Sequence, residues 1–245
     1  MNIAFIPVRG GSKSIPLKNI KELCGHPLVW WTANSANNAK CIDKVVIATD
    51  SDKIKEVVLS FNLDKVEVYD RDPVNAQDTS STESVMIEYI QKSGLKNDDN
   101  FFLIQATSPL LKSEHIDGMY QKFLEDRVDS MFTAVREKQF HWIETTSLTP
   151  RPLRERVDEV RVRGSQVTNE VKPVNYDYRN RPRRQDFEGL LAENGACYIN
   201  TVGNIIKDNC RLSGKIGFYE LPAETAYEID EESDWLIIES ILKFK

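Results

Sequence analysis

The sequence predicts an α/β protein built on one doubly wound, mainly parallel β-sheet. Apolar runs of strand length alternate with helical patterns from residue 3 to residue 135, and this alternation requires crossover connections between parallel strands. Polar and charged residues follow several of these strands directly, at the edge where such sheets bind ligands. With 245 residues, 40% of them hydrophobic, the chain is long enough to bury a full core as a single domain, residues 1–245.

The first strand, Ile3–Val8, runs into a loop that is rich in glycine and positive charge. Glycine lets the backbone approach a ligand closely, and a cationic loop full of amides suits a polyphosphate. The alternative is an ordinary strand and turn with solvated lysines. The candidate phosphate-binding residues of this loop are Arg9, Gly10, Gly11, Ser12, Lys13 and Lys18.

The loop follows neither of the two common phosphate-binding motifs. Ser12 separates Gly11 from Lys13, so the Gly-Lys-Ser/Thr succession of the Walker motif is missing. The dinucleotide fingerprint needs a third glycine that opens a helix, and Ser14-Ile15-Pro16 supplies none. Pro16 predicts that the chain stays extended up to Lys18.

A helix packed on the sheet is predicted after Pro27, with the apolar residues between 28 and 36 on one face. The second strand is Lys44–Thr49, followed by a helix over residues 52–61. Asp50 and Ser51 lie between them. Either residue caps that helix, or Asp50 faces a ligand at the end of its strand.

The alternation then continues through three more strands. They are Val66–Tyr69, Phe101–Gln105 and Ser130–Val135, separated by helices over residues 84–93 and 113–125. A serine or threonine before Glu83 is predicted to cap the first of these helices. Because the carboxyl ends of parallel strands meet at one edge, four side chains are expected there: Arg9, Asp50, Arg71 and Gln105.

The alternation stops between residues 136 and 193, a stretch rich in arginine and proline. It is too long for a plain connection and should have structure of its own or pack against a partner. It is either a charged, salt-bridged arm or a cover that supplies guanidinium groups to an anionic substrate. Strands at 195–200 and 216–221 and helices at 201–207 and 233–243 follow.

Composition excludes several classes of function. The formal net charge of −6 disfavours nucleic acid as a partner. No apolar run reaches membrane-spanning length, and the N-terminus does not read as a secretion signal. The four cysteines and three histidines are scattered, which disfavours a zinc site and indicates reduced thiols. A cytoplasmic protein is expected.

Six ordered blocks carry a family resemblance: RGGSKSIPLKN at 9–19, ATD at 48–50, DTSS at 78–81, QATSPL at 105–110, NGACYIN at 194–200 and YEID at 227–230. In these blocks the chain closely resembles the bacterial acylneuraminate cytidylyltransferases, the CMP-sialic acid synthetases. The resemblance implies a nucleotide-diphospho-sugar transferase fold and a homodimer with exchanged arms. It also implies a reaction in which CTP and a sugar α-keto acid give a CMP-sugar and pyrophosphate.

The resemblance assigns roles position by position. The CTP phosphates would be held by Arg9, Lys13 and Lys18, and the nucleoside by Asn19, Arg71 and Thr82. Gln105 would contact the sugar acid, and Tyr198 with Arg184 would lie near the incoming sugar or its carboxylate.

Asp230 matches a magnesium-binding aspartate of the family, and Glu228 stands where its partner is often a second aspartate. Positions two apart in an extended segment share a face, so both carboxylates can address one Mg²⁺. The alternative is that this acidic cluster only favours the positive end of the helix that follows.

The chemistry explains why such a site is made of cations and carboxylates. Two negatively charged reactants must meet, so positive side chains, backbone amides and a metal ion provide most of the help. Positioning and neutralisation dominate phosphoryl transfer. No covalent serine or cysteine intermediate is expected.

The sugar substrate is the point at which the chain departs from the family pattern. Relatives that use N-acetylneuraminate often carry a lysine near Trp142 and paired phenylalanines where this chain has Arg211-Leu212. This difference predicts a nine-carbon acid with another substituent, such as a deaminated or legionaminic-type sialic acid. The alternatives are an eight-carbon Kdo-type substrate, a uridylyl- or thymidylyltransferase acting on a sugar 1-phosphate, and a non-catalytic nucleotide-sensing relative.

Overall fold

The computed structural model describes residues 1–11, 14–75, 80–144 and 171–244. These residues form two compact units. The first unit contains Met1–Val135 and Ala192–Lys245, and the second contains Arg136–Leu191. The insertion predicted at 136–193 therefore falls on the second unit.

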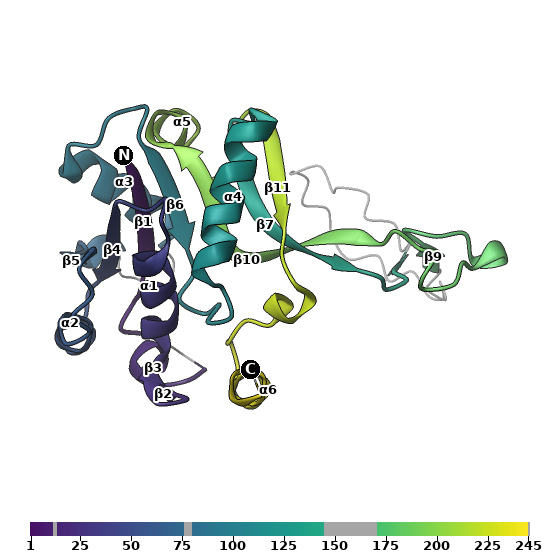
Figure 1. Cartoon of the computed structure of the whole chain (residues 1–245), viewed down its shortest axis with the longest axis horizontal. Coiled ribbons are helices and arrows are strands. Elements are labelled where there is room, and N and C mark those ends of the chain that lie inside the picture. Colours follow the sequence, from purple (N-terminus) through teal and green to yellow (C-terminus); the bar gives the residue numbers. More distant parts are fainter. Residues whose placement is uncertain (12–13, 76–79, 145–170, 245) are drawn as a thin grey trace, which may run out of the picture. The chain divides into compact units, whose positions relative to one another are not determined.

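A seven-stranded sheet in the order β11-β7-β10-β6-β1-β4-β5 forms the centre of the first unit (Figure 1). Its strands are β1 (Asn2–Pro7), β4 (Lys44–Thr49), β5 (Val66–Asp70), β6 (Asn100–Ile104), β7 (Ser130–Glu137), β10 (Leu190–Thr201) and β11 (Ile216–Glu220). β1 lies parallel to β4 and β6, β4 to β5, and β7 to β11. β10 runs antiparallel to β6. The predicted fold class, a mainly parallel α/β sheet, is confirmed.

The first unit contains six α-helices among its described residues, and the first five of them pack on the two faces of this sheet. The six helices are α1 (Leu28–Asn38), α2 (Asp52–Leu59), α3 (Thr82–Ser93), α4 (Ser113–Asp126), α5 (Val202–Asp208) and α6 (Glu232–Lys243). Successive residues of β1 point to opposite faces. Ala4 and Ile6 pack in one core with α1, α2 and α4, while Ile3 and Phe5 pack in another with α3 and α5. Each large side chain buried in this way contributes about 1.5–3 kcal/mol before entropy is subtracted.

The C-terminal helix α6 has a smaller core of its own. Trp235 and Ile238 pack there with Leu28 and Ile15, which fastens the end of the chain to the loop after β1. The short elements of the first unit are the hairpin β2 (Glu22–Leu23) and β3 (His26–Pro27), and the 3₁₀ turns η1 (Lys18–Ile20), η2 (Pro73–Asn75) and η4 (Ala223–Ala226).

Near Lys18 the local conformation differs from the sequence prediction. The chain does not stay extended, because Leu17 adopts a left-handed conformation with φ 52° and Lys18 begins η1. The turn is closed by a hydrogen bond from the Lys18 amide to the Ile15 carbonyl at 3.1 Å. Pro16 restricts its own φ and the residue before it but not the residues after it, so a turn can form immediately after the proline.

The second unit contains the antiparallel pair β8 (Trp142–Glu144) and β9 (Val171–Pro173), followed by η3 (Tyr178–Asn180). An aromatic cluster holds it together. The Phe140 ring lies 4.3 Å from the Tyr176 ring and 5.0 Å from the Phe187 ring, and the Arg181 guanidinium lies over it at 4.6 Å.

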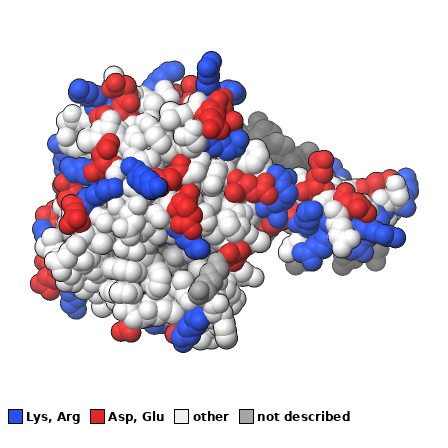
Figure 2. All heavy atoms as spheres, viewed as in Figure 1, with Lys and Arg blue, Asp and Glu red and all other residues white. Residues whose placement is uncertain are grey.

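Two general features bear on function. No helix among the described residues combines the length and apolar character needed to cross a membrane. On the face of the first unit visible in Figure 2, basic and acidic side chains are interspersed, so no basic patch of the kind that binds nucleic acid stands out there.

Candidate active site

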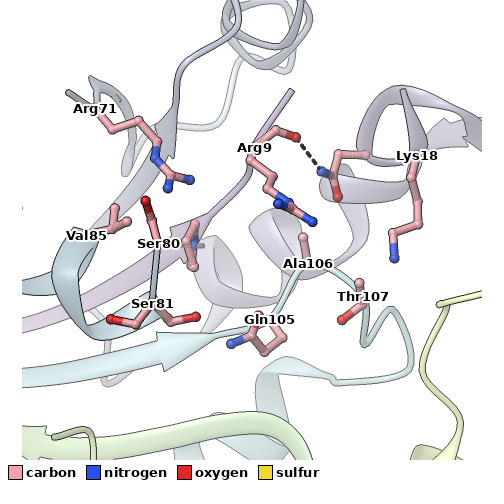
Figure 3. Close-up of a pocket in the computed structure, with 12 residues that line it drawn as sticks. Arg9, Lys18, Arg71, Ser80, Ser81, Val85, Gln105, Ala106 and Thr107 are labelled. Atoms are coloured by element: carbon pink, nitrogen blue, oxygen red, sulfur yellow. Dashed lines mark hydrogen bonds between the residues drawn. The ribbon is translucent and has the colours of Figure 1, made fainter. Parts of the chain in front are cut away.

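A cavity of about 320 Å³ lies at the carboxyl ends of β1, β5 and β6 (Figure 3). It is lined by Pro7, Arg9, Lys18, Asn19, Arg71, Ser80, Ser81, Thr82, Val85, Gln105, Ala106 and Thr107. This lining contains three cationic side chains and no carboxylate. The charge therefore suits an anionic ligand, and the hydroxyl and amide groups around it can fix the ligand's orientation.

Two side chains hold the start of the loop after β1. The Asn19 side-chain amide donates to the Arg9 carbonyl at 3.1 Å, the dashed contact of Figure 3. The Gly10 amide donates to Asp50 Oδ1 at 3.0 Å. A β-carbon on Gly10 would lie 2.9 Å from the β-carbon of Ser51, so glycine is required by this close approach.

Asp50 therefore has a role that the sequence did not predict. Neither Asp50 nor Ser51 makes a side-chain cap bond to α2, although Ser51 occupies the N-cap position. Asp50 instead bridges the ends of β1 and β4 through the Gly10 amide. No cue in the sequence marked this contact, because its partners are 40 positions apart.

Arg71 enters the cavity as a buried guanidinium that is 8% exposed. It donates through Nη2 to the Asn75 carbonyl, and its buried Nε has no hydrogen-bond partner among the described residues. Burial lowers the pKa of Arg71, while the charges of Asp50 and Glu88 act in the opposite direction. A buried N–H without an acceptor is costly, so this position favours a ligand that brings an acceptor.

The start of α3 forms another wall of the cavity. Ser81 is the N-cap and accepts a hydrogen bond from the Ser84 amide at 3.1 Å, which confirms the predicted cap before Glu83. Ser81 and Thr82 thereby line the cavity at the positive end of a helix dipole, an arrangement that also favours an anion.

Lys18 and Asp230, which are 212 positions apart in sequence, meet beside the cavity. Lys18 Nζ donates to the Ile229 carbonyl at 2.7 Å and to Asp230 Oδ1 at 3.2 Å. The Ser14 hydroxyl donates to the Asp230 carbonyl at 2.6 Å, and the Ile229 amide donates to the Thr107 carbonyl at 2.9 Å. The segment before α6 is thus joined both to the loop after β1 and to the turn after β6.

Glu228 lies close enough to Asp230 and Lys18 for both charges to act on it. Burial and the neighbouring Asp230 raise the pKa of Glu228 to about 7, while Lys18 acts against that shift. The Glu228 carboxylate packs against Gly195, where a β-carbon would lie 2.6 Å from Oε1. A carboxylate pair of this kind is a suitable place for a cation.

Asp234, a carboxylate further along the chain, stabilises the start of α6 and is not part of the Glu228–Asp230 pair. Asp234 Oδ2 accepts from the amides of Asp230 and Glu231 at 2.9 and 2.8 Å, which caps the start of α6. The described residues contain no group of three or more His, Cys, Asp or Glu side chains placed to hold a metal. Mg²⁺ commonly takes one or two carboxylates and completes its shell with phosphate oxygens and water, so Glu228 and Asp230 fit an ion shared with a bound triphosphate.

The residues predicted on the sugar side lie in different places. Gln105 lines the cavity, and its backbone amide donates to the Ala196 carbonyl at 3.1 Å. Tyr198 is 4% exposed and is not among the residues lining the cavity. Its hydroxyl donates to the Glu193 carboxylate, and its place beside the sugar stays a prediction.

An ion pair that the sequence did not reveal lies over Tyr198. Arg211 Nε donates to Glu83 Oε1 at 2.6 Å, and the guanidinium lies 5.1 Å from the Tyr198 ring centre. Glu83 and Arg211 are 128 positions apart, and no spacing rule connects them. The pair ties the first turn of α3 to the segment after α5.

The remaining predicted residues lie elsewhere. Arg184 belongs to the second unit, where it helps to line a cavity of about 630 Å³ with Lys138, Gln139, Phe140, Arg181, Pro182 and Arg183. Ser12 and Lys13 lie outside the described residues. Gly11 follows Gly10, and a β-carbon on it would meet no atom within 4 Å.

The structure also adds residues that the sequence did not single out for the site. Ser80, Ser81, Val85 and Thr107 line the cavity. Ser80 and Ser81 belong to the DTSS block and Thr107 to the QATSPL block. Membership in these two blocks is the sequence feature that could have identified these three residues.

Solved structures with a similar fold share little sequence with this chain. A CMP:2-keto-3-deoxy-manno-octonic acid synthetase complexed with CTP is 14% identical, with a TM-score of 0.60 over 99% of this chain and 98% of that one. The 2-C-methyl-D-erythritol 4-phosphate cytidylyltransferase of Francisella tularensis is 16% identical, with a TM-score of 0.61 over 98% of each chain. At this identity the likeness establishes the fold alone.

Sequence relatives are closer. The N-acylneuraminate cytidylyltransferase of Oncorhynchus mykiss is 36% identical over 242 residues, and N-acylneuraminate cytidylyltransferase A of Danio rerio is 33% identical over the same length. These matches cover 98% of this chain but 50% and 51% of the relatives, so the chain spans about half their length. The model of the family described as Cytidylyltransferase matches residues 3–196. That range includes every residue that lines the cavity at the end of β1, and the chain belongs to the cytidylyltransferase family.

Proposed function

We propose that this protein transfers CMP from CTP to a nine-carbon sugar α-keto acid, giving a CMP-sugar and pyrophosphate. The observation that carries the proposal is the cavity in which Arg9, Lys18 and Arg71 converge, with Asp230 joined to Lys18 at its border. Three cations suit a triphosphate, and the nearby carboxylates suit the metal ion that such a substrate brings. The names of the curated relatives point to the same class of acceptor.

In the proposed reaction, the anomeric hydroxyl oxygen of the sugar acid attacks the α-phosphorus of CTP. A bond forms between that oxygen and the α-phosphorus, the bond to the bridging oxygen of the β-phosphate breaks, pyrophosphate leaves with the electron pair, and the hydroxyl proton passes to solvent water. Arg9 and Lys18 hold the phosphates and compensate the charge that develops on the leaving group. Asn19, Arg71 and Thr82 orient the nucleoside, and Gln105 orients the acceptor.

A magnesium ion is part of this proposal. Glu228 and Asp230 would hold it. When bound, the ion would neutralise phosphate charge and polarise the α-phosphoryl group. Lys18 already donates to Asp230 Oδ1 and to the Ile229 carbonyl, so it keeps this carboxylate at the cavity. No serine or cysteine adduct is formed.

The choice of sugar is proposed from Arg211 and Leu212, which stand where relatives that use N-acetylneuraminate often have phenylalanines. Arg211 forms an ion pair with Glu83 and covers the Tyr198 ring, so this part of the protein is more polar than an aromatic pair. A polar surface suits a hydroxyl or another polar substituent of a deaminated or legionaminic-type acid. An eight-carbon keto acid is the competing substrate.

The protein is further proposed to act as a cytoplasmic homodimer with exchanged arms formed by about residues 136–193. Several large apolar side chains of that unit are exposed, among them Trp142, Ile143 and Val174 at 47%, 50% and 55%. Exposed apolar side chains grouped on a small unit favour burial against another protein surface.

The test is a pyrophosphate-release assay with CTP, Mg²⁺ and a panel of sugar acids, in which products are identified by mass. The panel contains N-acetylneuraminate, its deaminated and legionaminic analogues, and eight-carbon Kdo. Formation of a CMP-conjugate of a nine-carbon acid supports the proposal. Equal turnover of Kdo would overturn the preference, and activity restricted to UTP or dTTP with a sugar 1-phosphate would overturn the proposed reaction.

A further inference from the structure

Glu88, on the buried side of α3, is surrounded by hydrogen-bond donors. It is 7% exposed. Its Oε1 accepts from the Tyr69 hydroxyl at 2.6 Å and from the Asp72 amide at 2.9 Å, and its Oε2 accepts from the Asn75 side chain at 2.7 Å. Lys92, one turn further along α3, donates to Oε1 at 3.2 Å. A buried carboxylate is stable in this form because its oxygens are paired in this way.

Three of these donors come from one short segment, residues 69–75. This segment runs from the end of β5 through η2 and contains Arg71, which lines the cavity. Asn75, which donates to Glu88 from its side chain, also accepts from Arg71 Nη2 through its carbonyl. The contacts therefore run without interruption from Glu88 through Asn75 to the Arg71 guanidinium.

Charge acts in the same direction as these hydrogen bonds. Burial disfavours the ionised form of Glu88, but hydrogen bonds from Tyr69, Asn75 and Asp72 outweigh it and lower the pKa of this carboxyl. Glu88 thus remains negative, and its charge in turn helps to keep Arg71 protonated despite burial. The Arg71 guanidinium is held through Nη2, and its buried Nε keeps a donor without a partner among the described residues, which a ligand can satisfy.

We infer that Glu88 is a positioning residue of the nucleotide site: it fixes residues 69–75 so that the buried Arg71 guanidinium meets CTP at the right place. Glu88 does not itself line the cavity, and it acts through Asn75 and Arg71. This inference rests on the proposed function. Its consequence is specific, because loss of Glu88 weakens CTP binding more than it slows the chemical step.

The test compares Glu88→Gln with the wild type, using calorimetric titration with CTP in the absence of sugar acid. Glutamine keeps the shape but replaces one acceptor oxygen by an NH2 group that cannot accept, so the donors to either Oε1 or Oε2 lose their acceptor. We expect the dissociation constant for CTP to rise about tenfold, with kcat at saturating CTP changed by less than about twofold.

Asp117→Asn is the matched control for a purely structural effect. Asp117 is a carboxylate on α4 that accepts from the amides of Lys40 and Cys41 at 3.2 and 2.8 Å, away from the cavity lining. Both variants lose charged acceptors and some stability. Only Glu88→Gln should weaken CTP binding. Equal weakening in both would show a general loss of stability and would overturn the inference.

A double-mutant cycle shows whether Glu88 acts through Arg71. In an Arg71→Met background, Glu88→Gln should add less than about twofold to the loss of CTP affinity, because the two changes remove one interaction. Independent, additive losses would overturn the inference. Asn75→Ala gives a milder variant that keeps the backbone acceptor of Arg71, and about threefold weaker binding is expected from it.

The outcomes also separate the inference from the function on which it rests. Wild-type protein that does not bind CTP would overturn the proposed function and the inference together. Wild-type protein that binds CTP, together with a Glu88→Gln variant of unchanged affinity, would overturn the inference alone.

Discussion

At the residue scale, some side chains of the site are placed by the ends of parallel strands, and others are placed by contacts between distant parts of the chain. Arg9, Arg71 and Gln105 follow parallel strands directly, so the sequence predicted their convergence. Tyr198 lies within β10, opposite Leu103 of β6, and points into the core shared with α3. Its orientation depends on the register of two distant strands, and no local pattern shows that register.

Replacing Lys18 by methionine should lower kcat/KM for CTP by about 10²–10³-fold, because one of the few cations that stabilise the transferring phosphates is lost. The pyrophosphate-release assay measures the effect. Lys21→Met is the matched control, since Lys21 lies three positions away and pairs with exposed Glu232 at 2.9 Å outside the cavity lining. A similar loss in both variants would contradict the role of Lys18.

The Glu83–Arg211 pair should make stability depend on pH in the acid range. Burial raises the pKa of Glu83, but the hydrogen bond from Arg211 outweighs it, so the pKa lies below its usual value of 4.5. The stabilisation is therefore fully present above pH 4.5 and is lost as the pH falls through the lower pKa of the folded state. Glu83→Gln should cost about 1 kcal/mol at neutral pH.

Urea unfolding of both proteins between about pH 3 and pH 7 measures this dependence. The difference in unfolding free energy between wild type and Glu83→Gln should shrink towards the acid end. A difference that stays constant across the range would show that ionised Glu83 is not the source of the stabilisation.

At the element scale, the sequence predicted most strands and helices to within two residues. β4 agrees at both ends, Lys44–Thr49, because β-branched residues and a following Asp-Ser-Asp mark it clearly. α3 begins at Thr82 and not at Ser84, because Ser81 takes the cap. The turn at Leu17 was missed, since a left-handed leucine is sterically disfavoured and only surrounding contacts hold it.

Replacing Gly195 in β10 should change the position of Glu228, one of the two carboxylates proposed to bind Mg²⁺. The φ of Gly195 is +67°, and a β-carbon there would lie 2.6 Å from Glu228 Oε1. Gly195→Ala should destabilise the fold by about 1–2 kcal/mol through backbone strain. It should also displace Glu228 and raise the Mg²⁺ concentration needed for half-maximal activity about tenfold.

Gly94→Ala separates these two effects. Gly94 has nearly the same φ, +69°, but a β-carbon on it would meet no atom within 4 Å. The melting temperature of Gly94→Ala should fall about as much as that of Gly195→Ala, while the Mg²⁺ concentration that it needs for half-maximal activity should match that of the wild type. A shifted magnesium dependence in Gly94→Ala would assign the effect to strain alone.

At the scale of the whole molecule, the alternating pattern predicted the sheet, and its interruption predicted an insertion. The sequence did not predict that β10 would lie antiparallel to β6, because the apolar run at 195–200 carries no signal of strand direction. It also could not predict the aromatic cluster around Phe140, whose partners Tyr176 and Phe187 are distant in sequence. Such long-range contacts carry no local signal.

The proposed homodimer makes a prediction about surface chemistry. In solution the protein should have a mass near twice 28.1 kDa. Ile143→Lys combined with Val174→Lys should shift it towards the monomer, because these exposed apolar side chains of residues 136–191 would face the partner and charges cannot be buried there without pairing. Light scattering coupled to gel filtration, repeated over a range of concentrations, measures the shift.

Leu59→Lys is the matched control for this prediction. Leu59 is 62% exposed on α2, in the first unit, and its substitution should leave the mass unchanged. Circular dichroism of the double variant should match the wild type, since both changed side chains lie at the surface of their own unit. A wild-type protein that is monomeric at every concentration would refute the dimer. An unchanged dimer in the double variant would instead place the interface away from Ile143 and Val174.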